Sequence, residues 1–394
     1  MTRVLILSAS VGAGHVRAAQ AVEKAFRETH PEVEVSHQDV LDLTNRTFRR
    51  IYAQGYFDLV NKAPHVLGYF YDYFNEPSKR GRRDRLRQAL ERLNVAPIER
   101  FVLAAGVDLI IHTHFLSAEL VAGMRIAGTL ETPHVLVTTD FETHRAWLHM
   151  PCERFFTATE EGAEFLGCLG VPVERLSVTG IPIDPVFALA KSQAECRRKH
   201  GIEAGSRKVV LQLCGGLGVG PVEQFFTAIL RVALPIELVV VTGRNEELRD
   251  QLAAVPVPDR HRVRVLGFTT EMDEWMTAAD VVVSKPGGLT TSEALAKGLP
   301  MLIVNPIPGQ ESRNSDYLLE HQAGVKVNNL STLPFKLEQL LSDPARLSVL
   351  AENARRLGRP RAAFDVVEQS LAELERTRSD RANAVRLTGL DGLT

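Results

Sequence analysis

Short runs of apolar residues recur along the chain, and each run ends in a glycine-rich or polar turn that leads into a helical pattern. The first run, Val4 to Leu7, precedes the loop Ser8 to His15 and a helix whose apolar positions continue to Phe26. Continuous apolar runs of about four to eight residues predict buried strands, which are typical of parallel sheets. The chain is therefore expected to have an α/β fold. The predicted strands are 4–7, 33–35, 107–111, 133–137, 154–158, 176–178, 208–213, 237–241, 263–267, 280–284 and 301–305.

The alternation of strands and helices occurs twice, which predicts two successive doubly wound, Rossmann-like domains. Between them, Lys191 to Ser206 is charged and contains spaced glycines, as expected of a linker. Beyond Pro334 helical patterns predominate, and the sequence after Arg376 is polar. We expect an N-terminal domain at 1–185, a linker at 186–205, a C-terminal domain at 206–375 and a flexible tail at 376–394.

Composition restricts the class of protein. The 394 residues are 45% hydrophobic and 24% charged, an ordinary globular composition with room for about two domains. The net charge of −2 gives no overall basic surface for a nucleic acid. No apolar run of about 18 residues would cross a bilayer, and the N-terminal apolar run is too short for a signal peptide. The four cysteines are widely spaced, which favours a reducing cytoplasm.

The stretch from Asp280 to Gly298 reads as a buried strand, a glycine turn and a helix. Thr290 and Glu293 have the spacing of a capping box, which predicts the start of that helix. A glycine turn that feeds a helix N-terminus suits a phosphate or pyrophosphate. Glu293 has two possible roles, closing the capping box or accepting hydrogen bonds from both hydroxyls of a ribose.

The loop before the first helix starts like a dinucleotide fingerprint, with glycines at positions 12 and 14. Arg17 stands at the third glycine position, which argues against an NAD site, although Asp39 imitates the acid of such a site. His15 lies inside this loop, where a histidine is suited to remove a proton from a hydroxyl. The alternative is that His15 only caps its own loop.

Polar residues follow three strands of the first half, in Ser8 to His15, His112 to His114 and Asp140 to His144. These segments should converge, because the carboxyl ends of parallel strands lie at one edge of the sheet. His112 and His114 have no further ligands at metal-site spacing, so we predict no metal.

The second half holds the anion-binding features, and a ligand is expected in the cleft between the two domains. Its glycine pairs are Gly215-Gly216 and Gly287-Gly288, and Gln310-Glu311 is an amide and carboxylate pair suited to sugar hydroxyls. A base, a diphosphate cradle and a polyol clamp together predict sugar transfer from a nucleotide.

Residues 44–90 interrupt the α/β rhythm. Phe48, Tyr52 and Tyr56 recur at helical spacing, and six of the nine residues from Lys79 to Arg87 are basic. Apolar and basic groups side by side favour an interfacial segment on anionic lipid. The alternative is a helix packed on its own domain with a solvated basic face.

Taken together, the motifs resemble those of the monogalactosyldiacylglycerol synthase and processive diacylglycerol glucosyltransferase family, which is similar to glycosyltransferase family 28. The resemblance runs from about residue 3 to residue 350. It implies a GT-B fold and an inverting transfer, without metal or cofactor, from a UDP-sugar to diacylglycerol. The matching motifs are Gly12-Ala-Gly14-His15 with Ala18-Ala19, Thr139-Asp140 with His144 and Trp147, Gly180-Ile-Pro182, Gly267-Phe268, Ser284 to Glu293, and Pro308 to Glu311.

The resemblance also implies roles for single residues. His15 becomes the catalytic base, Glu293 would hold the ribose, and the Phe268 backbone would meet the uracil. Gln310 and Glu311 would face the sugar. The family would place a peripheral protein at the cytoplasmic face of the cell membrane, in contact with anionic lipids. The remaining implied positions are Gly215, Gly216, Gly287, Gly288 and Thr290 at the diphosphate, Gly14, Asp140 and His144 at the acceptor, and Tyr69, Phe70, Tyr73, Arg80, Arg82 and Arg83 at the membrane.

The chain departs from the family pattern at His114-Phe115 and at Ser312-Arg313. Arg313 adds a positive charge near the expected sugar, and this favours the hypothesis of a uronic-acid donor beside glucose and galactose. Two other functions stay open at this point. One is an epimerase that acts on a free UDP-sugar, and the other is a non-catalytic protein that binds UDP or lipid.

Overall fold

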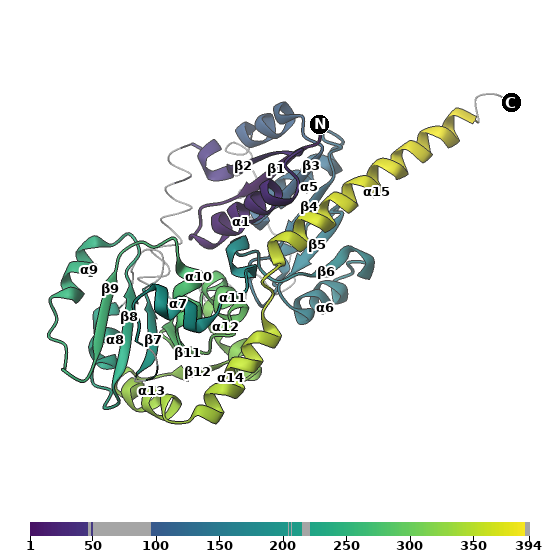
Figure 1. Ribbon diagram of the computed structural model, residues 1–394. Coiled ribbons are helices and arrows are strands. Elements are labelled where there is room, and N and C mark those ends of the chain that lie inside the picture. Colours follow the sequence, from purple (N-terminus) through teal and green to yellow (C-terminus); the bar gives the residue numbers. More distant parts are fainter. Residues whose placement is uncertain (46–48, 50–95, 204, 206, 215–220, 391–394) are drawn as a thin grey trace, which may run out of the picture. The chain divides into compact units, whose positions relative to one another are not determined.

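The computed structural model describes residues 1–45, 49, 96–203, 205, 207–214 and 221–390. These residues form two units, and each unit is built on a six-stranded parallel sheet (Figure 1). The first unit contains residues 1–185 and 361–394, and the second contains residues 186–360. The predicted α/β class with two doubly wound sheets is confirmed.

The sheet of the first unit has the strand order β2-β1-β3-β4-β5-β6. The chain leaves β1 on one side and β3 on the other, so their adjacent carboxyl ends form a switch point, where open α/β sheets bind ligands. The elements are β1 (Arg3–Ser8), α1 (Gly14–Thr29), β2 (Glu34–Asp39), η1 (Val40–Leu43), β3 (Leu109–His112), α5 (Phe115–Ile126), β4 (His134–Val137), η2 (Arg145–Trp147), β5 (Arg154–Thr157), α6 (Glu160–Cys168), η3 (Val173–Arg175), β6 (Leu176–Val178) and α15 (Ala362–Leu390), with a further helix at 96–105.

The sheet of the second unit has the order β12-β11-β10-β7-β8-β9, with its switch point between β7 and β10. Strand β12 was not predicted, because four residues that include a glycine and a lysine give a weak strand pattern. The elements are η4 (Pro185–Ala188), α7 (Gln193–Lys199), β7 (Lys208–Leu213), α8 (Val222–Ile229), β8 (Ile236–Val241), α9 (Glu246–Ala253), β9 (Arg262–Leu266), α10 (Met272–Ala278), β10 (Val281–Ser284), α11 (Gly288–Ala296), β11 (Met301–Val304), α12 (Gln310–Glu320), β12 (Gly324–Val327), η5 (Leu330–Thr332), α13 (Leu333–Leu341) and α14 (Pro344–Leu357).

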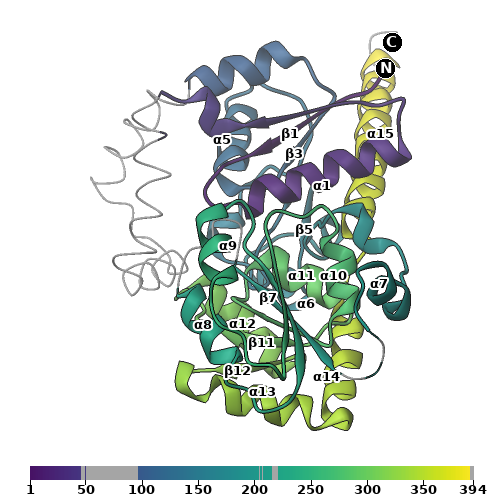
Figure 2. The ribbon, with the colours of Figure 1, turned by 60° about the vertical axis from the view of Figure 1, so that its left-hand side comes forward.

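Helix α15 corrects two predicted boundaries. It lies beside α1 in the first unit (Figures 1 and 2), where Val366, Val367 and Leu374 pack into the core around β1 and α1. The prediction that the second domain extends to residue 375 is therefore wrong. Burial of these apolar residues places α15 in the first unit. The prediction of a flexible tail from residue 376 is also wrong for the residues up to Leu390. The helix continues to Leu390, and Arg378 forms an ion pair with Asp108 at 2.8 Å.

The predicted linker at 186–205 is part of the second unit. It contains α7, which packs on α10, and the guanidinium of Arg197 donates to the carboxylate of Asp280 at 2.8 Å.

Across the described ranges, we find no helix that combines the length and the apolar character needed to span a membrane.

Candidate functional site

His15 is the second residue of α1 and lies at the switch point of the first sheet. Its Nδ1 is 3.0 Å from the main-chain oxygen of Thr113 and 2.8 Å from Oγ1 of Thr139. A carbonyl oxygen only accepts hydrogen bonds, so we assign the ring hydrogen to Nδ1. This tautomer leaves a lone pair on Nε2, which is the form that a general base needs.

The surroundings of His15 favour its neutral form. Burial lowers the pKa of His15 below its ordinary value, because the charged imidazolium loses hydration. The carboxylate of Asp140 and the carbonyl of Thr113 act in the opposite direction, and His144 adds to the lowering. The imidazole is therefore a neutral base near pH 7.

Asp140 and His144, both predicted near the acceptor, are brought close to His15. Oδ2 of Asp140 accepts a hydrogen bond from Nε1 of Trp147 at 2.9 Å and lies 3.3 Å from Nε2 of His144. The ring of Trp147 is fully buried, with its centroid 6.3 Å from that of His15. Asp140 thus sets a fixed negative charge beside the candidate base.

His114 also belongs to this site, although it was predicted only to lie at a strand end and was given no role. Its ring meets that of His15 edge to face, with 4.5 Å between the centroids. Nδ1 of His114 accepts the backbone N–H of Leu116 and caps α5, which assigns the ring hydrogen to Nε2. His15 and His114 therefore offer complementary groups, an acceptor and a donor.

Gly14, which was predicted at the acceptor, has free space where a side chain would stand. A Cβ added at Gly14 would meet no heavy atom of the described residues within 4 Å. The position predicted at the acceptor thus lies on an open side of the loop.

In the second unit, the turn after β10 starts α11 earlier than predicted. Gly287 is the N-cap of α11, and the helix begins at Gly288 without a side-chain cap. Thr290 consequently lies inside the first turn, and the predicted capping box of Thr290 with Glu293 is wrong. Glu293 is only 5% exposed, on the helix that follows the turn.

The two glycines of the turn have different roles. The N–H of Gly287 donates to the carbonyl of Lys285 at 2.9 Å, so Gly287 shapes the turn and its N–H is occupied. Gly288 starts the helix, where the first N–H groups lack partners from within the helix. Behind the turn, buried Asn314 donates from Nδ2 to the carbonyl of Pro286 at 2.9 Å.

Gln310 and Glu311 open α12 beside this turn. Oε2 of Glu311 accepts the N–H of Ile307 at 2.8 Å, and Oε1 would lie 3.9 Å from a Cβ added at Gly287. Burial raises the pKa of Glu311, and the charge of Lys285 partly opposes this shift. The predicted sugar clamp and the predicted diphosphate turn are thus neighbours.

Phe268 lies after β9 and is 65% exposed, and the guanidinium of Arg244 lies 5.5 Å from the centroid of its ring. Several predicted residues lie outside the described ranges. These are Gly215 and Gly216 of the second glycine loop and Tyr69, Phe70, Tyr73, Arg80, Arg82 and Arg83 of the membrane-facing segment 44–90, of which only residues 44, 45 and 49 are described.

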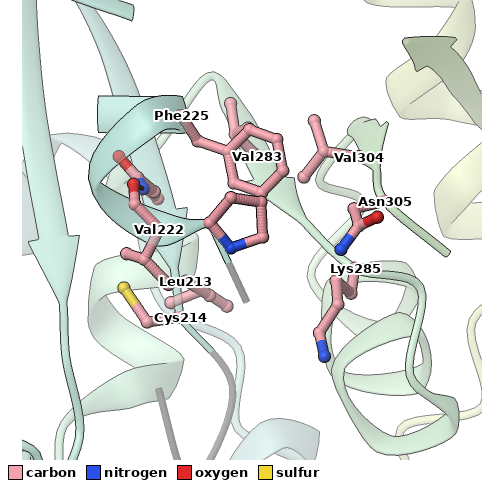
Figure 3. A pocket seen from close by; sticks show the side chains of 10 residues that line it. Leu213, Cys214, Val222, Phe225, Val283, Lys285, Val304 and Asn305 are labelled. Atoms are coloured by element: carbon pink, nitrogen blue, oxygen red, sulfur yellow. Dashed lines mark hydrogen bonds between the residues drawn. The ribbon is translucent and has the colours of Figure 1, made fainter. Parts of the chain in front are cut away.

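A pocket opens at the switch point of the second sheet, where β7, β10 and β11 end (Figure 3). Its apolar wall includes Val222 and Phe225 of α8, and Lys285 and Asn305 line another side. Asn305 has φ 44°, a left-handed conformation that asparagine tolerates better than most residues. Lys285, Asn305 and Asn314 were not predicted as site residues from the sequence. The one available signal was a lysine placed directly before the glycine turn.

Two family models match successive parts of the chain. The model described as monogalactosyldiacylglycerol (MGDG) synthase matches residues 15–183, and the glycosyltransferase family 28 C-terminal domain matches residues 221–364. The processive diacylglycerol beta-glucosyltransferase of Bacillus cereus (strain AH187) is 29% identical over 386 residues, which is 94% of each chain.

Solved structures show the same fold. MurG of Acinetobacter baumannii superimposes with a TM-score of 0.63 and 18% identity, covering 94% of this chain and 100% of MurG. Anabaena Alr3699/HepE in complex with UDP-glucose has a TM-score of 0.54 and 16% identity, with 96% and 100% covered. The two six-stranded parallel sheets and these neighbours identify the GT-B fold.

Proposed function

Since the chain belongs to the family of monogalactosyldiacylglycerol synthases and processive diacylglycerol glucosyltransferases, we propose that it transfers a hexose from a UDP-sugar to the hydroxyl of diacylglycerol. The observation that carries the proposal is the similarity to a processive diacylglycerol beta-glucosyltransferase over 94% of the chain. The fixed tautomer of His15 gives it a chemical basis.

The first unit supplies the base. Nε2 of His15 takes the proton from the acceptor hydroxyl as the oxygen attacks the anomeric carbon of the sugar, and UDP leaves with the bonding electron pair. A single attack from the side opposite the leaving group inverts the anomeric carbon. When His15 becomes an imidazolium, the carboxylate of Asp140 stabilises its charge.

The second unit holds the donor. Glu293 accepts hydrogen bonds from the ribose hydroxyls, and the backbone at Phe268 contacts the uracil. The turn with Gly287 and Gly288 and the start of α11 near Thr290 bind the diphosphate, as helix N-termini do. Gly215 and Gly216 join them in the proposal, and Gln310 with Glu311 binds the sugar. The proposal includes neither a metal ion nor a cofactor.

The lipid substrate places the protein at a membrane. We propose that it binds peripherally to the cytoplasmic face of the cell membrane, through the aromatic and basic residues of segment 44–90 and anionic lipid headgroups. Flotation with vesicles that contain anionic lipid tests this. A protein that stays at the bottom of the gradient would contradict it.

The sugar is glucose or galactose, with glucuronate as the finer hypothesis. Arg313 on α12 follows the proposed sugar clamp by two residues, and its guanidinium would pair with a uronate carboxylate. Arg313→Ala should then lower transfer from UDP-glucuronate more than transfer from UDP-glucose. Unchanged use of UDP-glucuronate would reject the hypothesis.

Product identification tests the proposed function. The protein is incubated with each UDP-sugar and with vesicles that contain diacylglycerol, and the lipids are identified by mass. A glycosylated diacylglycerol is expected. Conversion of the UDP-sugar to an epimer without lipid would show the epimerase alternative instead.

A further inference from the structure

Lys285 is a half-buried cation at the switch point of the second sheet. It follows β10 directly and precedes the Pro286-Gly287-Gly288 turn. In the part of the chain that the structure describes, its ammonium makes no hydrogen bond and no ion pair. Lys191 and Lys199 of the same unit lie 2.6 Å from Asp273 and 2.8 Å from Glu271, respectively.

The carboxylate of Glu311, which interacts electrostatically with Lys285, is already engaged. Glu311 accepts the N–H of Ile307 at 2.8 Å, which holds its carboxylate on the loop before α12. A half-buried ammonium without a carboxylate within contact distance pays a cost in hydration. Such a cation is expected where an anionic ligand completes the charge balance.

The pocket beside Lys285 contains a second unused polar group. Gln212 is 2% exposed and donates from Nε2 to the carbonyl of Val222 at 3.1 Å. Its Oε1 has no hydrogen-bond partner among the described residues, although it is buried. Buried amide oxygens are normally bonded, so this atom indicates a polar ligand or a water in the pocket. Lys285 and Asn305 line the same pocket (Figure 3).

We infer that Lys285 is the cation that binds the diphosphate of the donor. The inference rests on the proposed function and gives a role to Lys285, which lies within the motif Ser284 to Glu293 but was given no role there. The pocket lies at the switch point between β7 and β10, and Lys285, which lines it, stands three residues before the start of α11. Lysine acts on a phosphate as a point charge, so its single ammonium suits this position.

The position of Lys285 also matters for the transfer step. As the bond between the anomeric carbon and the β-phosphate oxygen breaks, the electron pair stays on that oxygen and the proton of the acceptor goes to His15. The negative charge of the leaving UDP therefore grows at the diphosphate. A positive charge fixed at this place stabilises the transition state more than the bound donor.

The test compares the affinities of uridine, UMP and UDP by titration calorimetry. Lys285→Met keeps the aliphatic stem and removes the charge, and Lys285→Arg keeps a charge. Lys208→Met is the control, because Lys208 lies at the amino end of β7 and does not line the pocket at the carboxyl ends of the strands. Lys285→Met should weaken UDP binding about tenfold to a hundredfold and leave uridine binding unchanged, which also shows that the variant is folded. Lys285→Arg should restore part of the UDP affinity.

The outcomes separate this inference from the proposed function. UDP binding that is equally tight in Lys285→Met and in the unmodified protein would overturn the role of Lys285 and leave the nucleotide donor in place. An unmodified protein that binds UDP no more tightly than uridine would overturn both. An equal loss of uridine and UDP affinity in Lys285→Met would also contradict the inference, because the effect would not lie at the phosphates.

Discussion

The imidazole of His15 donates its Nδ1 hydrogen to the main-chain oxygen of Thr113, 3.0 Å away. Because a backbone carbonyl does not donate, this contact fixes the tautomer whatever side chain stands at position 113. The hydroxyl of Thr113 in turn donates to the main-chain oxygen of His15 at 2.9 Å. The two loops after β1 and β3 thus hold each other, and Nε2 of His15 is left as the base.

The pH dependence of the transfer should follow His15. Since burial lowers the pKa of His15, kcat/KM should fall only when the pH drops below the ordinary histidine range, where Nε2 gains a proton. Asp140 raises the pKa of His15, so Asp140→Asn should move this acidic limb to lower pH. Kinetics between about pH 4 and 8 measure the shift. Asparagine keeps an acceptor for Trp147, and a limb that stays in place would contradict the electrostatic role of Asp140.

Glu293 should bind the ribose. Glu293→Ala should weaken UDP binding about tenfold to a hundredfold, because two hydrogen bonds to a carboxylate are lost. The same change should weaken binding of 2′,3′-dideoxy-UDP much less, since that ligand has no diol. Equal losses for the two nucleotides, measured by calorimetry, would argue for a role in folding the helix instead.

Gly358 should be required for the stability of the second unit. A Cβ at Gly358 would lie 2.5 Å from the main-chain oxygen of Leu295 on α11, and that backbone cannot turn aside. Gly358→Ala should lower the free energy of unfolding by about 1–3 kcal/mol. Gly267→Ala is the matched control, because its Cβ would come no closer than 3.7 Å to a neighbour.

Urea unfolding followed by tryptophan fluorescence measures this effect. The chain has two tryptophans, Trp147 in the first unit and Trp275 in the second. In a Trp147→Phe background the signal therefore reports on the second unit alone. If Gly358→Ala leaves the urea midpoint unchanged, then α11 and the end of α14 can move apart with little loss of stability.

Much of the fold follows from local patterns in the sequence. Buried strands such as Val281–Ser284 are continuous apolar runs, and each is followed by residues that stop a strand. The end of the second domain could not be found in this way. Residues 362–374 carry helical apolar positions that would suit either unit, and only tertiary packing assigns α15 to α1.

The candidate site was predictable where residues follow strand ends and less so where contacts come from distant segments. His15, Thr113 and Thr139 are far apart in sequence, and sheet order alone brings them together. The prediction of a capping box at Thr290 was wrong because α11 starts earlier, with Gly287 as its N-cap. Asn314 supports the turn from another helix, a contact that no local pattern encodes.

Glycolipid formation by His15→Ala tests directly whether His15 is the base of a transfer to diacylglycerol. The variant and the unmodified protein are incubated with UDP-glucose or UDP-galactose and vesicles that contain diacylglycerol, and UDP binding is measured in parallel. We predict glycosyl-diacylglycerol from the unmodified protein, and a rate about a hundredfold to ten-thousandfold lower from His15→Ala with UDP affinity nearly unchanged. Near-normal glycolipid formation by the variant would show that His15 is not the base.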